Sequence, residues 1–242
     1  MNEIPFDAKT ATQEEIEAWF AKFAATDLLN QEPQAFGTIY ADPPWRFTNR
    51  TGKMAPEHKR LHRYPTMSFS EIAELPIARI AKPKSHLYLW VPNALIAEGL
   101  DVMKRWGFDY KTNIVWYKVR KDGGPDRRGV GFYFRNVTEI CLFGTRGTGV
   151  RTAQPGRTQP NIVVSRKTGH SRKPVEMYEI IETCSYGPRI ELFSRTSRPG
   201  WTMWGNQTGL YELEETLDVD DNNGFATPLI SNQLDLQLGR NL

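Results

Sequence analysis

A chain of 242 residues with 39 % hydrophobic and 12 % aromatic residues is long enough for one α/β domain, but short for two domains of ordinary size. No stretch approaches the roughly 18 apolar residues of a membrane span, and residues 1–10 lack the pattern of a signal peptide, so a cytoplasmic protein is expected. The two cysteines, Cys141 and Cys184, suggest neither a disulfide framework nor a zinc site.

The formal net charge of +3 conceals an uneven distribution of charge. Seven of the 28 acidic residues but one of the 31 basic residues fall within 211–242, so the rest of the chain carries about nine excess positive charges. A basic body favours a polyanionic partner. An acidic end of this kind is expected to be poorly ordered, which predicts a single domain over 1–210 followed by a tail over 211–242.

The first predicted elements are a helix and a strand. Thr12 followed by Glu15 fits a capping box, and apolar residues then recur with helical spacing, which predicts an amphipathic helix over 12–25. A β-prone run over 36–41 stops at Asp42, where two prolines follow that cannot donate the hydrogen bonds of a sheet. The sequence therefore predicts a strand that ends in a rigid turn.

Helices and strands alternate in the rest of the domain. The predicted elements are a short helix begun by the capping box Ser68–Glu71, a buried strand over 86–91, a helix capped by Asn93 and ending near Trp106, strands over 112–119 and 137–143, a helix over 174–187 and a strand over 189–193. This alternation predicts an α/β fold with a mostly parallel sheet and helices on both faces. Such sheets bind ligands at the carboxyl ends of their strands, where Asp42 is expected.

The tetrapeptide Asp42-Pro43-Pro44-Trp45 points to a specific chemistry. The exocyclic amine of adenine is a poor nucleophile, so a catalyst must accept hydrogen bonds from it and aim its nitrogen at an electrophilic methyl group. The Asp42 carboxylate and the Pro43 carbonyl can accept the two amine hydrogens, with no competing amide donor expected, and Trp45 can stack on the base. This chemistry depends on positioning and electrostatics and needs no metal. The alternative is a rigid turn whose tryptophan belongs to the core.

The chain resembles the adenine methyltransferases that carry this tetrapeptide, whose eukaryotic members modify messenger RNA and whose bacterial and phage members modify DNA. The likeness covers roughly residues 27–208 and includes segments 64–67, 87–91, 106–107, 114–118, 139–144, 171–174, 191–195 and 205–207 in the family's order. It implies S-adenosylmethionine as the cofactor. It also implies a circularly permuted Rossmann-like methyltransferase fold, in which the catalytic motif precedes the cofactor motif.

The predicted cofactor-binding residues are Asp27, Lys173, Arg195, Ser197, Asn206 and Gln207. Lys173 can pair with the methionine carboxylate of the cofactor, and Arg195 follows a strand end where a ligand would lie. Asn206 and Gln207 can bind the ribose hydroxyls. The family resemblance places Asp27 near the cofactor's adenine. The family often has a His-Asn pair where this chain has Ser197 and Arg198, so the contacts there are expected to be rearranged.

Nineteen of the 31 basic residues fall in the stretches 46–63, 118–135 and 146–173, at predicted connections after strand ends. The alternative to a nucleic-acid interface is an ordinary solvated surface. The predicted target-base and nucleic-acid residues are Arg46, Tyr64, Arg127, Arg128 and Glu139. A base in a duplex must be flipped out or already single-stranded, so Tyr64 could stack on it, and by resemblance Glu139 could orient it. Ordinary core packing or a strand-end ion pair is the alternative for Tyr64 and Glu139.

The leading hypothesis is a DNA adenine methyltransferase of bacterial or phage type, favoured by a compact chain without the accessory domains of large messenger-RNA enzymes. The alternatives are an RNA adenosine methyltransferase and a non-catalytic, nucleic-acid-binding partner subunit. Methylation of the cytosine amine would use the same chemistry, but the tetrapeptide argues against it by family likeness. Homo- and hetero-oligomers both remain open.

Overall fold

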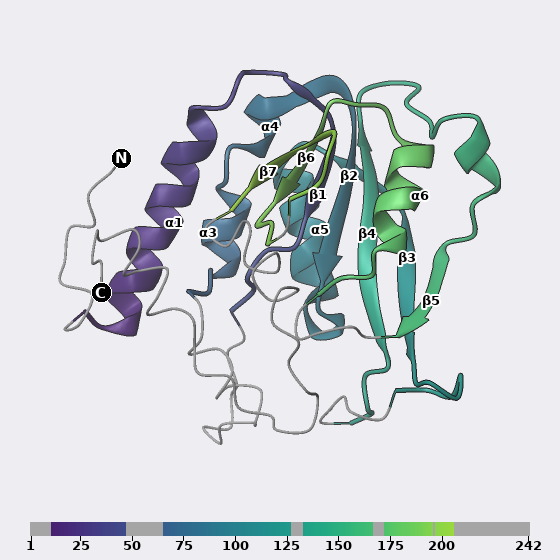
Figure 1. The fold of residues 1–242 in the computed structure, drawn as a ribbon. Coiled ribbons are helices and arrows are strands. Elements are labelled where there is room, and N and C mark those ends of the chain that lie inside the picture. Colours follow the sequence, from purple (N-terminus) through teal and green to yellow (C-terminus); the bar gives the residue numbers. More distant parts are fainter. Residues whose placement is uncertain (1–10, 47–64, 127–132, 167–171, 196, 206–242) are drawn as a thin grey trace.

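A computed structural model of the protein describes residues 11–46, 65–126, 133–166, 172–195 and 197–205. These residues form a seven-stranded sheet in the order β5-β3-β4-β2-β1-β6-β7 (Figure 1). The strands are β1 (Phe36–Ala41), β2 (Ala81–Val91), β3 (Asp109–Val119), β4 (Thr138–Arg146), β5 (Ile162–Arg166), β6 (Arg189–Leu192) and β7 (Trp201–Trp204). The predicted tail over 211–242 lies outside the described residues.

The sheet is mostly parallel, as the sequence predicted. Neighbouring strands pair in parallel everywhere except at β4, which is antiparallel to both β2 and β3. Strand β1, which Asp42 follows, is an interior strand and comes first in the chain, whereas its neighbour β6 comes late. This order agrees with the permuted Rossmann-like arrangement.

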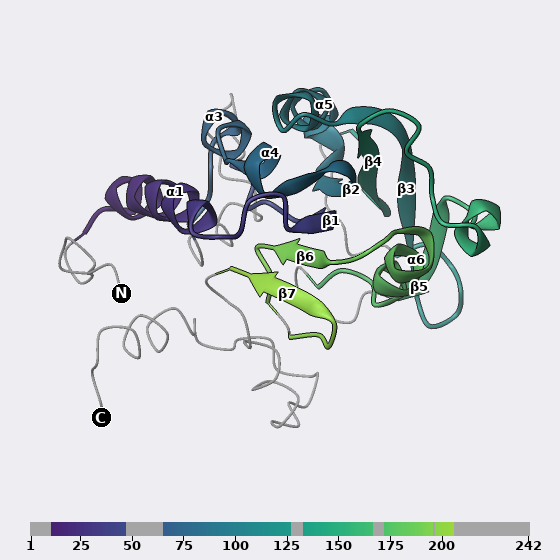
Figure 2. The ribbon, with the colours of Figure 1, turned by 90° about the horizontal axis from the view of Figure 1, so that it is seen from above.

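Helices cover both faces of the sheet, which confirms the predicted layers (Figure 2). The helices are α1 (Gln13–Leu29), α3 (Phe69–Ala73), α4 (Ile77–Ile80), α5 (Ile96–Arg105) and α6 (Glu176–Cys184), with 3₁₀ turns η1 (Asn93–Leu95) and η2 (Pro155–Thr158). Helices α1, α3, α4 and α5 pack on one face, over a core that includes Ile39 and Leu87. Helix α6 packs on the other face, where the alternate residues Tyr40 and Tyr88 point. None of the helices described combines the length and apolarity that a bilayer crossing requires.

Local signals placed most helix starts correctly. Both predicted capping boxes are present, at Thr12–Glu15 and at Ser68–Glu71, and each satisfies main-chain donors of the first turn. Helix α1 continues to Leu29, four residues beyond the prediction, because Phe20, Ala24 and Leu28 form a buried stripe against the sheet.

The prediction that Asn93 caps a helix is wrong. Its side chain does not cap η1 or α5; instead its amide nitrogen donates to the carbonyl oxygen of Thr138 at 3.1 Å. This contact ties the end of β2 to the start of β4. The edge strands β5 and β7 were not predicted, and β2 and β3 begin earlier than expected.

Candidate active site

The chain after β1 forms the rigid turn that the prolines predicted. The Met67 amide donates to the Pro44 carbonyl at 2.8 Å, and the Arg46 amide donates back to the Met67 carbonyl at 2.9 Å. The Trp45 amide donates to the Pro43 carbonyl at 2.8 Å, so the expectation of no competing amide donor is wrong. A carbonyl oxygen has two lone pairs, and the Pro43 carbonyl therefore retains capacity for one more hydrogen bond.

Trp45 is a core residue in the structure. Its side chain is 6 % exposed, packs in the cluster beneath β1 and β2, and donates its indole N–H to the Trp90 carbonyl at 3.0 Å. A ring buried to this extent offers no open face to a base. The structure thus corrects the stacking prediction: Trp45 anchors the turn that presents Asp42.

Four charged side chains converge beside this turn. The Lys173 ammonium lies 2.9 Å from Asp42 Oδ2 and 3.3 Å from Glu139 Oε2. Glu139 Oε1 in turn lies 2.5 Å from the Lys118 ammonium. We call Asp42, Lys118, Glu139 and Lys173 the ion cluster; it contains two carboxylates and two ammonium groups, so its formal charges cancel.

The ion cluster assembles because different elements end or begin at one edge of the sheet. Asp42 follows β1, Lys118 is near the end of β3, and Lys173 precedes α6. Glu139 is at the start of β4, and it reaches the same edge because β4 alone runs antiparallel to its neighbours. The carboxyl edge of the sheet is therefore where the structure concentrates charge, as expected for this fold class.

Each lysine of the ion cluster lies over an aromatic ring. The Lys173 ammonium lies 5.2 Å from the Trp90 ring centroid, and the Lys118 ammonium lies 5.2 Å from the Trp116 ring centroid. The Trp90 indole N–H donates to the Tyr40 hydroxyl at 2.8 Å, which fixes the ring. Cation–π attraction compensates part of the cost of removing an ammonium from water, so these rings favour the positions that the two ammonium groups occupy.

The ion pairs govern the protonation of the cluster. Burial alone would raise the pKa of Glu139, but the charges of Lys173 and Lys118 outweigh it and lower the pKa to about 2. Burial alone would lower the pKa of Lys173, but Asp42 and Glu139 raise it above its usual value. Both groups are consequently charged at neutral pH.

Glu191, in β6, is a second acidic group near Asp42. Burial raises its pKa to about 7; the Tyr178 hydroxyl, which donates to Glu191 Oε2 at 2.7 Å, opposes this rise, whereas the charge of Asp42 adds to it. A carboxyl that titrates near neutrality at the ligand-binding edge can hold or release a proton at physiological pH.

Glu191 should make stability depend on pH. Its pKa in the folded protein is above its value in the unfolded chain, so its contribution is fully present below about pH 4.5 and is lost as pH rises through about 7. Relative to wild type, Glu191→Gln should therefore become more stable by about 2–3 kcal/mol between pH 5 and pH 8. The amide oxygen can still accept from Tyr178. Chemical denaturation of both proteins at the two pH values measures this difference; a constant difference would contradict it.

The structure brings several predicted cofactor residues to the same edge. Arg195 lies just beyond β6, close enough that its charge opposes the raised pKa of Lys173. Asp27, near the end of α1, accepts the indole N–H of Trp204 at 2.6 Å, which places its carboxylate beside the end of β7. Ser197 is exposed after β6. The predicted residues Tyr64, Arg127, Arg128, Asn206 and Gln207 lie outside the described residues, and their roles stay predictions.

The Arg46 side chain is held by ion pairs and hydrogen bonds within the protein. Its guanidinium lies 2.8 Å from Glu17 and 3.7 Å from Glu71, and it donates to the Thr66 carbonyl at 3.2 Å. These contacts hold the turn after Trp45 against α1 and α3. The structure thus favours a role for Arg46 in fixing the turn over the predicted role in nucleic-acid binding.

Sequence reasoning missed Lys118, Trp90 and Glu191 as site residues. The alternation of a strand could have identified Lys118, because Ile114, Trp116 and Lys118 fall on one face of β3. No signal in the sequence paired Lys118 with Glu139, since that contact depends on the antiparallel register of β3 and β4.

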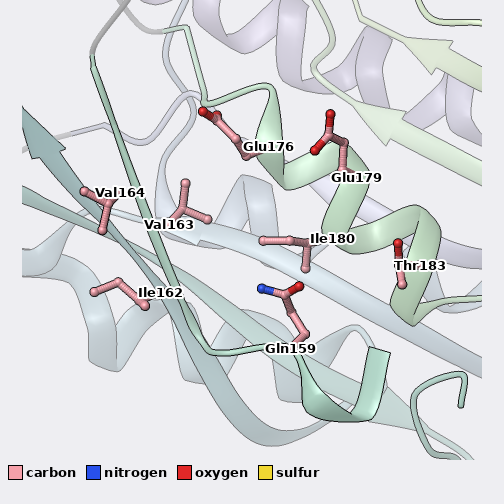
Figure 3. A pocket seen from close by; sticks show the side chains of 8 residues that line it. All are labelled: Gln159, Ile162, Val163, Val164, Glu176, Glu179, Ile180 and Thr183. Atoms are coloured by element: carbon pink, nitrogen blue, oxygen red, sulfur yellow. The ribbon is translucent and has the colours of Figure 1, made fainter. Parts of the chain in front are cut away.

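A groove of about 380 Å³ lies between β5 and α6, on the α6 side of the sheet (Figure 3). Its floor is apolar, with Ile162, Val163 and Ile180, and the carboxylates of Glu176 and Glu179 lie on its α6 wall. No member of the ion cluster lines it. Two carboxylates would repel phosphates, so this groove is a poor candidate for the nucleic-acid site.

The permuted α/β sheet, with an Asp-Pro-Pro-Trp turn at its carboxyl edge, defines a methyltransferase of the Rossmann-like class. The MT-A70 family matches residues 36–207, and the chain belongs to this family.

Three relatives illustrate the range of similarity. A putative N(6)-adenosine-methyltransferase MT-A70-like of Medicago truncatula is 32 % identical over 188 residues, which are 75 % of this chain and 28 % of that protein. The type II methyltransferase M.MunI of Mycoplasma sp is 26 % identical over 208 residues, 77 % of this chain and 84 % of that protein. The N(6)-adenosine-methyltransferase non-catalytic subunit METTL14 of Xenopus tropicalis is 29 % identical over 192 residues, 73 % of this chain and 40 % of that protein. The chain thus spans less than a third of the Medicago relative.

Proposed function

We propose that the protein transfers a methyl group from S-adenosylmethionine to the exocyclic amine of adenine in DNA. The observation that carries this proposal is the position of Asp42, whose carboxylate is presented by a rigid Pro-Pro turn at the carboxyl edge and is paired with Lys173 at 2.9 Å. Membership in the MT-A70 family and the names of the adenosine-methyltransferase relatives support the choice of the adenine amine.

Asp42 and Pro43 would orient the amine. A carboxylate has about four acceptor positions, so Asp42 can accept an amine hydrogen while Lys173 remains bound. The remaining lone pair of the Pro43 carbonyl can accept the second hydrogen, which localises the lone pair of the nitrogen. As positive charge develops on the nitrogen, the Asp42 carboxylate stabilises that charge and can accept the departing proton.

The donor set fits S-adenosylmethionine. Lys173 and Arg195 supply neighbouring cations that can hold a carboxylate. Asp42, Glu139 and Glu191 supply nearby carboxyl groups that suit a positively charged sulfonium. When bound, the cofactor supplies the electrophilic methyl group. Asp27 and Ser197 would complete its binding together with Asn206 and Gln207.

The choice of DNA over RNA rests on the resemblance to bacterial and phage members and on the match to M.MunI. The matched region makes up 84 % of that type II methyltransferase but 28 % of the Medicago relative. The matched region therefore accounts for most of the length of M.MunI.

A non-catalytic partner subunit is the second candidate, because METTL14 is among the relatives. The ion cluster argues for the catalytic alternative, since Asp42 and Lys173 are both present and in contact. Association of this chain with a catalytic or non-catalytic relative, as a homo- or hetero-oligomer, is compatible with either candidate.

The direct test is transfer of labelled methyl groups from S-adenosylmethionine to DNA and RNA in parallel, followed by mass spectrometry of the nucleosides. N6-methylated adenine in DNA is expected. Methylated adenosine in RNA alone would replace the substrate, and binding of the cofactor without transfer to either would favour the partner-subunit candidate. Absence of cofactor binding would contradict the proposed activity.

A further inference from the structure

Two adjacent aromatic side chains stand out on the surface of the protein. Tyr133 is 91 % exposed and Phe134 is 84 % exposed, more than any other large hydrophobic side chain of the residues described. A single exposed apolar residue is ordinary, but adjacent exposed aromatics form a patch that commonly marks a binding surface. We call Tyr133 and Phe134 the aromatic pair.

The aromatic pair belongs to the connection between β3 and β4, which ends at the ion cluster. The Lys118 amide donates to the Val137 carbonyl at 2.8 Å, and Glu139 follows two residues later. Glu139 is five positions after Phe134, and a fully extended chain over five positions spans at most about 18 Å. The segment also lies at the edge of the sheet where β3 and β5 end (Figure 1). The pair therefore lies at the same edge of the sheet as the ion cluster.

Basic side chains accompany the aromatic pair along this edge. Arg135 follows it directly, Lys121 lies near the start of the same connection, and Arg166 ends the neighbouring β5; all three are exposed. An aromatic surface next to cations matches the surfaces on which proteins stack nucleic-acid bases while contacting the backbone. A purely apolar protein partner would have no use for these cations.

The target adenine itself creates a need for such a surface. Removing a base from a stack costs a few kcal/mol, and the neighbours it leaves lose a stacking partner. We propose that the aromatic pair stacks on a base next to the target adenine and stabilises the substrate with that adenine displaced. This inference rests on the proposed function and specifies how the same site holds its substrate.

Binding of short fluorescein-labelled single-stranded DNA and of RNA of the same sequence, with S-adenosylhomocysteine present, tests the inference. Replacing both Tyr133 and Phe134 by alanine should weaken binding by about tenfold or more. Phe134→Trp should retain affinity, whereas Phe134→Leu, which keeps an apolar side chain but loses the ring, should weaken it. The matched control is Tyr186→Ala, which removes an exposed aromatic preceding β6, at the opposite edge of the sheet.

The salt dependence of binding separates stacking from phosphate contacts. Loss of the aromatic pair should leave the slope of log affinity against log salt unchanged, whereas Arg135→Ala should reduce it. Wild-type affinity in the double alanine variant, with methyl transfer intact in the wild type, would overturn this inference alone. A change of oligomeric state in that variant without weaker oligonucleotide binding would also overturn it and assign the pair to a protein interface. Absence of both oligonucleotide binding and methyl transfer in the wild type would instead defeat the proposed function.

Discussion

Asp42→Asn should lower kcat for methyl transfer by about 100- to 10,000-fold, with the fold retained. Asparagine has nearly the same shape, so the Pro-Pro turn and the Met67 hydrogen bonds to it should persist. The amide lacks the negative charge that stabilises the amine nitrogen as it becomes positive, and it cannot accept the departing proton. Single-turnover methyl transfer, with circular dichroism to verify the fold, measures the effect.

The matched control is Asp101→Asn. Asp101 forms an exposed ion pair with Arg105 on α5, with their atoms 3.0 Å apart, so its loss removes a carboxylate away from the ion cluster. Activity should remain within about twofold of wild type, because exposed pairs of this kind contribute little. Full activity in Asp42→Asn would rule out the proposed role of the carboxylate and leave Asp42 as part of a structural turn.

Lys173→Met should weaken S-adenosylmethionine binding by about ten- to a hundredfold, the usual value of a charge-assisted hydrogen bond. The substitution also removes the cation between Asp42 and Glu139, which lie 2.9 and 3.3 Å from its ammonium. The two carboxylates then repel each other, so the pKa of Glu139 should rise from about 2. Calorimetry of cofactor binding, and the pH dependence of methyl transfer, measure the two consequences.

Lys118→Met is the matched control for charge loss. Lys118 contacts Glu139 at 2.5 Å, and Asp42 keeps its contact with Lys173. This variant should share the rise in the pKa of Glu139 but keep most of the cofactor affinity. Equal losses of affinity in both lysine variants would mean that cluster charge alone governs binding, and unchanged affinity in Lys173→Met would place the cofactor elsewhere.

Local patterns were sufficient for much of the fold. The capping boxes depend on residues three apart, and the strand ending at Asp42 depends on adjacent prolines, so both were predictable from short segments. Strand β5 was missed because it is a short edge strand whose apolar run is only three residues long, over 162–164, and one residue of the five is buried. Its pairing with β3 joins segments far apart in the chain.

The site shows the same division. The chemistry of the tetrapeptide identified Asp42, the position before a helix identified Lys173, and the resemblance identified Glu139. Their mutual contacts depend on three elements meeting at one edge. Trp45 illustrates the opposite error. A tryptophan beside a candidate catalytic carboxylate suits base stacking as well as core packing. The hydrogen bond that distinguishes these alternatives joins Trp45 to the carbonyl of Trp90, which is 45 residues later in the chain.

Because β4 runs antiparallel to β3, Lys118 and Glu139 belong to the two paired strands and not to the connection between them. The hydrogen bond from the Lys118 amide to the Val137 carbonyl closes the base of the connection over 120–137. The paired residues Trp116 and Glu139 lie within the ladder of β3 and β4, beyond that hydrogen bond. Doubling the length of such a loop costs only about 0.6 kcal/mol. Replacing the sequence between residues 120 and 136 should therefore change the surface beside this edge while leaving the register of β3 and β4, and with it the contact between Lys118 and Glu139, in place.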